Sequence, residues 1–166
     1  MNFRTFTASL LLFGLMAGLI ACSSNNNNIT APDYSAVPKP YDTTGAPRTV
    51  QNDGLIIYHI KAGSGPFQVV PQDQIQIEYT GRTTDGKIFD STYEKSRLGV
   101  PFVMSPAATD GSGNFSYVRG FREGLLGMKK GEERTLVIPP DLGYAGTTNK
   151  LAGDTLIFDI KLIGFQ

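Results

Sequence analysis

Period-2 patterns in two segments, 74–79 and 155–163, limit what this chain can fold into more than any other feature: polar and apolar residues alternate in the first, and Leu156, Phe158, Ile160 and Leu162 share one face of the second. Successive side chains of a β-strand point to opposite faces of a sheet, so this pattern predicts antiparallel strands that are buried on one face. Further strands are predicted for four shorter apolar runs: 55–60, 88–89, 101–104 and 134–138. We therefore expect an antiparallel sheet.

One short helix is predicted between the strands at 101–104 and 134–138. Phe121, Leu125 and Met128 recur at i, i+4 and i+7, so they share one helix face. We expect the helix to end at Gly131, after two lysines whose charge suits a helix C-terminus. Together these elements predict an α+β domain, a curved antiparallel β-sheet wrapped over one short α-helix.

Composition excludes several kinds of functional site. The chain has 15 basic and 15 acidic residues and a formal net charge of zero, so no basic surface for nucleic acid is expected. One histidine and one cysteine are too few for a zinc site built on these residues or for an internal disulfide. We expect no metal, no cofactor and no nucleic-acid partner.

The first residues are expected to form a lipoprotein signal peptide, 1–21. Arg4 is followed by an apolar run, 10–20, that suits a signal peptide but is shorter than the ~20 residues of a membrane span. Leu19-Ile20-Ala21-Cys22 resembles the bacterial lipobox, in which cleavage precedes a lipidated cysteine. The alternative is a plain secretory signal with a free Cys22 thiol.

A lipidated Cys22 would carry diacylglycerol through a thioether and a further amide-linked acyl chain, which together give firmer anchoring than one chain. Ser23 provides no acidic signal for retention in the inner membrane. We therefore expect a lipid-anchored protein of a bacterial cell envelope, in the outer membrane and facing the periplasm.

Polar, asparagine-rich and proline-rich composition sets the next segment apart. It shows no apolar period of 2 or 3.6, which predicts a lipidated N-terminus and tether at 22–52 before a folded domain at 53–166. The alternative for part of this segment is docking on the domain through Tyr34, Val37 and Tyr41.

Six motifs follow one another in a characteristic order across the domain. They are Tyr79-Thr80-Gly81, Asp85-Gly86-Lys87-Ile88-Phe89-Asp90-Ser91, Pro101-Phe102, Val118-Arg119-Gly120-Phe121, Met128-Lys129-Lys130-Gly131-Glu132 and Leu156-Ile157-Phe158-Asp159-Ile160. With them, residues 54–165 resemble the FKBP-type (tacrolimus-binding) peptidyl-prolyl cis–trans isomerases. The fold that this resemblance implies is the one predicted above.

The resemblance also implies an aromatic pocket for a prolyl residue. Phe121 would form its floor, where the family usually has Trp, and Asp90 would orient neighbouring groups. The Tyr144 hydroxyl and the Val118 backbone N–H would donate hydrogen bonds to ligand carbonyls. The implied catalytic residues are Tyr79, Phe89, Asp90, Phe121, Tyr144 and Phe158; the implied substrate-binding residues are Phe102, Tyr117 and Val118.

Two functions remain open at this point. The first is an isomerase that assists the folding of exported proteins, with unfolded or partly folded proline-containing polypeptides as its partners. The second is a catalytically weak or inactive peptide-binding or chaperone lipoprotein that uses the same pocket only to bind. Tacrolimus-like macrolides are a further class of ligand that the resemblance implies.

Overall fold

The structure is a computed structural model that describes residues 31–98, 100 and 102–166. Ala31–Gln166 form one compact unit. Its strands are β1 (Arg48–Val50), β2 (Ile56–Lys61), β3 (Ile75–Thr83), β4 (Ile88–Ser91), β5 (Phe102–Met104), β6 (Glu133–Ile138) and β7 (Leu156–Phe165). Its helices are α1 (Arg119–Leu125) and two 3₁₀ turns, η1 (Lys95–Arg97) and η2 (Pro140–Leu142).

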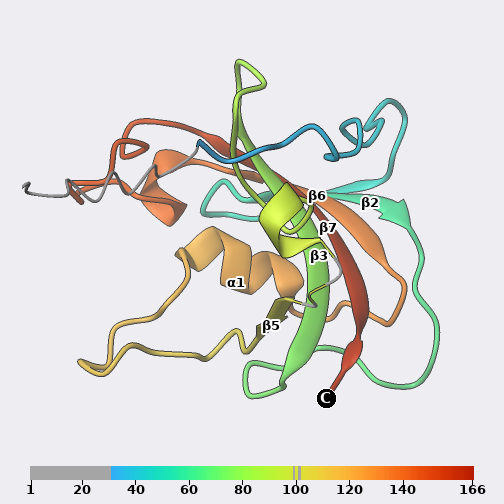
Figure 1. Cartoon of the computed structure of the whole chain (residues 1–166). Helices are drawn as coiled ribbons and strands as arrows, with labels where there is room; N and C mark the ends of the chain where they lie inside the picture. Colours follow the sequence, from blue (N-terminus) through green and yellow to red (C-terminus); the bar gives the residue numbers. More distant parts are fainter. Residues whose placement is uncertain (1–30, 99, 101) are drawn as a thin grey trace, which may run out of the picture. The chain divides into compact units, whose positions relative to one another are not determined.

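The seven strands form one antiparallel sheet, and α1 lies against one face of it (Figure 1). The strand order is β1-β2-β6-β7-β3-β4, with β5 pairing with β3 outside this path. The predicted α+β fold is confirmed, and the sheet is open rather than closed into a barrel.

The two alternating segments become the central pair of the sheet, β3 and β7. Ile75 and Ile77 on β3 and Ile160 and Leu162 on β7 are at most 1% exposed, so one face of each strand lies in the core. β3 runs past the alternating segment to Thr83, through residues that are buried on both faces. β7 ends at Phe165, two residues beyond the predicted segment.

The helix differs from its prediction at the C-terminal end. Phe121 and Leu125 lie on α1 as expected, but Met128 lies beyond it, buried on the following segment. The chain leaves the helix at Gly127, which has φ +75°, a conformation that glycine adopts at low cost. Gly131 also has a positive φ, but it comes four residues later, before β6.

The described part of the expected tether packs on the sheet. Residues 48–50 form strand β1, and residues 31–47, here called the strap, run across the outer side of the domain (Figure 1). Tyr34, Val37 and Tyr41 are half-buried, as in the docked alternative. Residues 22–30 and the signal peptide at 1–21 lie outside the described residues.

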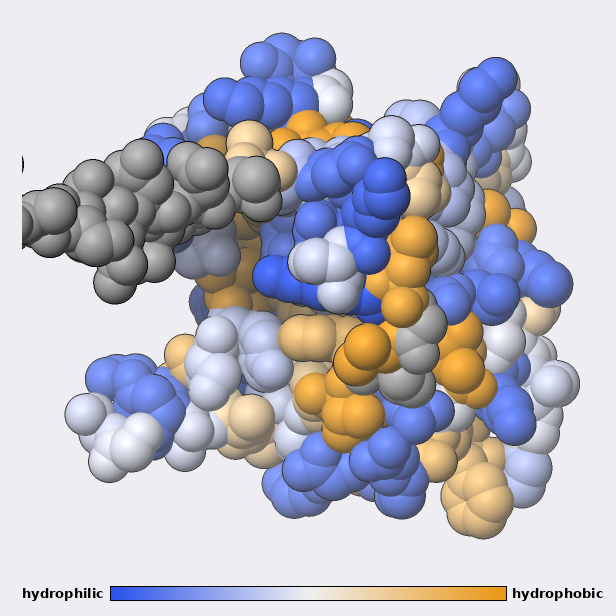
Figure 2. All heavy atoms as spheres, in the orientation of Figure 1, coloured by the Kyte–Doolittle hydropathy of each residue, from blue (hydrophilic) through white to orange (hydrophobic). Residues whose placement is uncertain are grey.

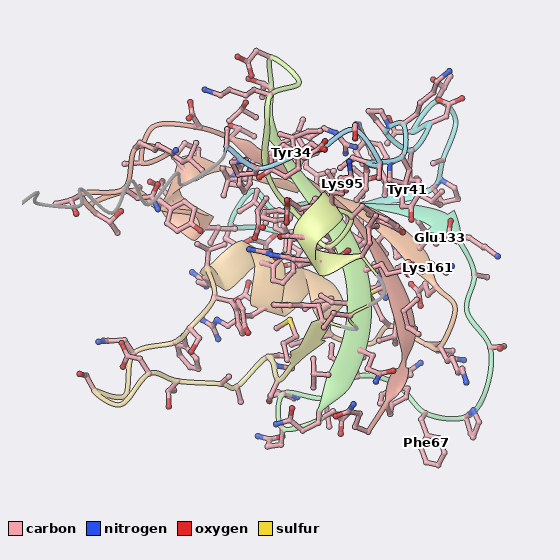
Figure 3. The ribbon with its side chains drawn as sticks, in the orientation of Figure 1. Tyr34, Tyr41, Phe67, Lys95, Glu133 and Lys161 are labelled. Atoms are coloured by element: carbon pink, nitrogen blue, oxygen red, sulfur yellow. The ribbon has the colours of Figure 1, made fainter. Side chains whose placement is uncertain are left out.

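A buried ion pair holds the strap. Arg82 Nη1 on β3 contacts Asp159 Oδ2 on β7 at 2.6 Å, and both side chains are under 10% exposed. Arg82 Nη2 donates to Pro38 O at 3.0 Å, and Tyr41 N donates to Asp159 Oδ2 at 3.3 Å. Figure 3 shows Tyr41 on the same side of the sheet as Lys161, with which it lines a small cavity.

In the described part of the chain, no helix has the length and apolar character needed to cross a bilayer.

Candidate functional site

A cavity of about 720 Å³ opens between α1 and strands β3, β4, β5 and β7. Figure 2 shows the hollow in the surface, with hydrophobic residues inside it. All nine residues that the family resemblance implies line this cavity: Tyr79, Phe89, Asp90, Phe102, Tyr117, Val118, Phe121, Tyr144 and Phe158. Five other lining residues lie outside that set: Arg97, Ser116, Asn149, Lys150 and Leu151.

Phe121 lies at the centre of the aromatic cluster. Its ring centroid is 4.8 Å from that of Phe158, 5.6 Å from that of Tyr79 and 6.2 Å from that of Tyr117. These separations are typical of favourable edge-to-face and tilted aromatic pairs. At 4% exposure, Phe121 forms the closed end of the cavity.

Gly81 makes room for two of the wall residues. It is paired with Phe158 across β3 and β7, and a Cβ at this position would lie 2.6 Å from the Phe89 ring and 2.8 Å from the Phe158 ring. Because glycine has no side chain, the two rings can meet edge to face with centroids 5.4 Å apart. Gly81 therefore shapes the cavity without lining it.

The polar groups of the cavity converge on Asp90. Its carboxylate accepts hydrogen bonds from Tyr79 Oη at 2.6 Å, from Arg97 Nη1 at 2.9 Å and from Ser91 N at 2.9 Å. Burial, followed by the hydrogen bond to Asp90, raises the pKa of Tyr79, so the phenol stays protonated at neutral pH. Arg97 belongs to no recognised motif, and nothing in its sequence context pointed to this contact.

Tyr144 reaches the cavity from the segment after η2. Burial, followed by the negative charge of Asp90, raises the pKa of Tyr144 above its usual value. In the part of the chain that the structure describes, neither the Tyr144 hydroxyl nor the Val118 backbone N–H has a hydrogen-bond acceptor. Both groups are positioned to donate to a ligand in the cavity.

The arrangement suits a flat, uncharged ligand. Aromatic rings supply most of its lining, the carboxylate of Asp90 is already bonded to Tyr79 and Arg97, and two donors lie at the rim. Pockets of this kind orient an apolar ligand with a few polar contacts.

Comparison with known proteins agrees with this geometry. A profile described as "FKBP-type peptidyl-prolyl cis-trans isomerase" matches residues 65–163, more than half of the chain. The chain belongs to this family. The recognition from its motifs is confirmed at this level, and the lipoprotein part of the prediction remains a proposal.

Relatives of this family member come from several kingdoms. FK506-binding protein 1A of Neurospora crassa is 37% identical over 122 residues, which cover 70% of this chain and 92% of the relative. Human peptidyl-prolyl cis-trans isomerase FKBP2 is 39% identical over 104 residues, covering 61% of this chain and 67% of the relative. The names of such relatives and the family profile confirm the predicted enzyme class, peptidyl-prolyl cis–trans isomerase.

Among solved structures, FkpA from Escherichia coli is similar with a TM-score of 0.59 and 30% sequence identity. The match covers 72% of this chain but only 51% of FkpA. The likeness therefore concerns the domain that carries the aromatic cavity, and not the remaining half of that protein.

Proposed function

We propose that this protein isomerises Xaa-Pro bonds of exported polypeptides in the cavity above Phe121. The observation that carries the proposal is the convergence of the aromatic residues on one cavity in a domain of the isomerase family, with unused donors at Tyr144 and Val118. In this assignment the prolyl ring lies on Phe121, between Tyr79, Phe89, Phe102 and Phe158, and ligand carbonyls accept from the two donors.

The reaction needs no acid–base pair. Rotation about the prolyl amide is opposed by a resonance barrier of ~18–20 kcal/mol, and a twisted amide loses resonance and carbonyl charge. An apolar cavity that holds the twisted form better than the planar one lowers this barrier, because catalysis is differential binding. Uncatalysed exchange takes roughly 10–100 s, and millisecond turnover requires about 6 kcal/mol of such stabilisation.

Isomerase turnover of the full-length protein in mild detergent tests the proposal. A blocked tetrapeptide containing one Xaa-Pro bond is followed with an isomer-selective protease, with and without tacrolimus. We expect turnover that tacrolimus inhibits. Binding of the macrolide without turnover would overturn the catalytic proposal and leave the peptide-binding alternative.

We further propose that Cys22 carries a lipid and becomes the mature N-terminus in a bacterial envelope, with the outer membrane and the periplasm as its location. The support is Leu19-Ile20-Ala21-Cys22 directly after the apolar run at 10–20. Since residues 31–47 pack on the domain, residues 22–30 remain to connect lipid and domain, and they can span at most ~30 Å. The isomerase would thus work close to the membrane.

Exchange of Cys22 for serine tests the anchor. Cys22→Ser should move the protein to the soluble fraction, or leave an uncleaved precursor, with unchanged turnover of the tetrapeptide. Membrane fractionation and the mass of the N-terminal peptide report the result. Wild-type protein that is wholly soluble, with an unmodified thiol at Cys22, would leave only simple export.

A further inference from the structure

A second cavity lies directly beside the aromatic one. It has a volume of about 630 Å³ and shares three lining residues with the aromatic cavity: Phe89, Lys150 and Leu151. The two spaces are thus separated only by side chains of β4 and of the loop before β7. Its size lies within the range of ordinary ligand sites, ~300–1,000 Å³.

The strap supplies the outer wall of this cavity, which we call the strap groove. Its lining residues are Pro32, Tyr34, Thr83, Thr84, Asp85, Lys87, Ile88, Phe89, Lys150, Leu151 and Asp154. Pro32 and Tyr34 come from the strap, and the others come from the β3–β4 turn, from β4 and from the loop before β7. The groove therefore exists only because the strap is docked.

The strap is held at the groove by its contacts with η1. Asp33 O accepts a hydrogen bond from Lys95 N at 3.0 Å, and Asp33 N donates to Glu94 Oε1 at 3.3 Å. Lys95 Nζ also lies 3.4 Å from Asp33 Oδ2, and Figure 3 shows Tyr34 and Lys95 at this junction. The same 3₁₀ turn carries Arg97 into the aromatic cavity, so one element borders both sites.

The pKa of Tyr34 is affected by burial and by the charge of Asp90 in the neighbouring aromatic cavity. Partial burial raises the pKa of its phenol, and the negative charge of Asp90 raises it further. A strap residue is thus close enough to the aromatic cavity to interact with its carboxylate. This supports the continuity that the shared lining residues indicate.

The lining of the strap groove suits a stretch of polypeptide. Ile88, Phe89 and Leu151 offer apolar surface for a side chain, while Thr84 offers a hydroxyl group to a peptide N–H or C=O group. The Thr83 hydroxyl is already bonded to Asp85 and to the Lys87 carbonyl, so it shapes the β3–β4 turn instead. Two lysines and two aspartates balance in charge, which favours no strongly charged ligand. Among the described residues, neither Lys87 nor Lys150 forms an ion pair, so both are available to carbonyl oxygens.

We propose that the strap groove is a second substrate subsite, which binds the residues that flank the proline on one side in an extended conformation. The inference rests on the proposed isomerase function and extends it from a prolyl bond to a longer segment of unfolded chain. Peptides long enough to enter both cavities are then better substrates than short ones.

Two peptides with the same central Xaa-Pro bond test this subsite on the full-length protein in mild detergent. One is a blocked tetrapeptide and the other a 12-residue peptide, and exchange NMR of the proline signals gives kcat/KM for both. We expect the longer peptide to have the higher kcat/KM. Tyr34→Ala should lower kcat/KM for the longer peptide by about fivefold, the usual effect of losing one good contact, and leave the tetrapeptide unchanged.

Thr84→Trp, which places a large ring at the groove, provides a second variant and should act in the same way as Tyr34→Ala. Tyr58→Ala is the matched control, because Tyr58 is a half-buried tyrosine of β2 that lines neither cavity. Absence of tetrapeptide turnover in the unchanged protein would overturn the proposed function itself. Equal kcat/KM for both peptides, or an equal loss for both in Tyr34→Ala, would overturn the subsite while the isomerase function stands.

Discussion

Phe121 belongs both to the cavity lining and to the hydrophobic core. It closes the cavity that we assign to the prolyl ring, and at 4% exposure it is also a member of the hydrophobic core. Asp90, by contrast, is 38% exposed and acts through hydrogen bonds to its neighbours. Shape at Phe121 should therefore matter more for turnover than charge at Asp90.

Truncation of these two residues tests that ranking. Phe121→Ala should lower kcat/KM for the tetrapeptide by about tenfold or more, since the floor of the cavity is removed, and Asp90→Ala by less. Removing a buried phenylalanine also costs about 3–5 kcal/mol of stability, so Phe121→Leu serves as a milder variant, with thermal melting as the folding check. A larger loss in Asp90→Ala would show that the carboxylate dominates.

The tyrosines of the cavity predict how turnover depends on pH. The pKa values of Tyr79 and Tyr144 lie above the usual value of about 10, so both phenols stay neutral between pH 6 and 8. We expect a nearly flat pH–rate profile over this range. The stability that comes from burying these neutral phenols is complete below about pH 10 and is lost as the pH rises through their raised pKa values. A bell-shaped profile centred near pH 7 would indicate acid–base catalysis instead.

At the scale of elements, α1 depends on two glycines for its approach to the sheet. A Cβ at Gly120 would lie 2.5 Å from Ile138 Cγ2, and one at Gly124 would lie 2.3 Å from Leu136 Cδ1. Leu136 and Ile138 are both fully buried on β6, so neither can move aside easily. The close packing of α1 on β6 sets the depth at which Phe121 lies.

Gly124→Ala should therefore destabilise the protein, although alanine is favoured over glycine in a helix by ~1 kcal/mol. Overpacking of a filled core typically costs about 1–3 kcal/mol, which outweighs that gain. Gly111→Ala is the control, because no atom lies within 4 Å of a Cβ there and its φ is not positive. Urea unfolding of both variants measures the difference, and a stabilised Gly124→Ala would contradict the packing argument.

The strands could be predicted from the sequence because alternation is a local signal. The site residues could be predicted from the order of the motifs, although their convergence depends on the pairing of β3 with β7. The end of α1 was misplaced because Gly127 and Gly131 are both plausible stops, and only tertiary contact with Val69 decides between them: Gly127 N donates to Val69 O at 2.9 Å. Arg97 was missed because it joins Asp90 through a turn with no periodic pattern.

At the scale of the whole described unit, the sequence left open whether the strap is a free tether or is docked on the domain. Its composition is that of a linker, and its attachment depends on Arg82 and Asp159, which are 77 residues apart in sequence. Asp159 also accepts from Thr135 Oγ1 at 2.7 Å, so three strands and the strap meet at one carboxylate. These contacts attach the strap to the centre of the sheet.

Asp159→Ala should cost about 3–5 kcal/mol, because it leaves the Arg82 guanidinium buried without its partner. Lys161→Ala is the control, since Lys161 pairs with Glu78 at 3.8 Å near the surface, where such pairs contribute only ~0–1 kcal/mol. Amide hydrogen exchange at Tyr41, whose N–H donates to Asp159, should accelerate in the first variant alone. Unchanged exchange at Tyr41 would show that the strap is held by other contacts.

The position of β7 between β6 and β3 affects when the chain can fold during its synthesis. β7 is synthesised after the other six strands, yet it pairs with β3 over nine residue positions and with β6 over six. Until it emerges, β3 and β6 have no partner between them, and the sheet remains in two unconnected parts. Since contacts distant in sequence form late, a nascent chain of this topology stays unfolded for most of its synthesis. An extended chain is the form that a narrow translocation channel can accept, so late completion of the sheet is compatible with the export that we propose.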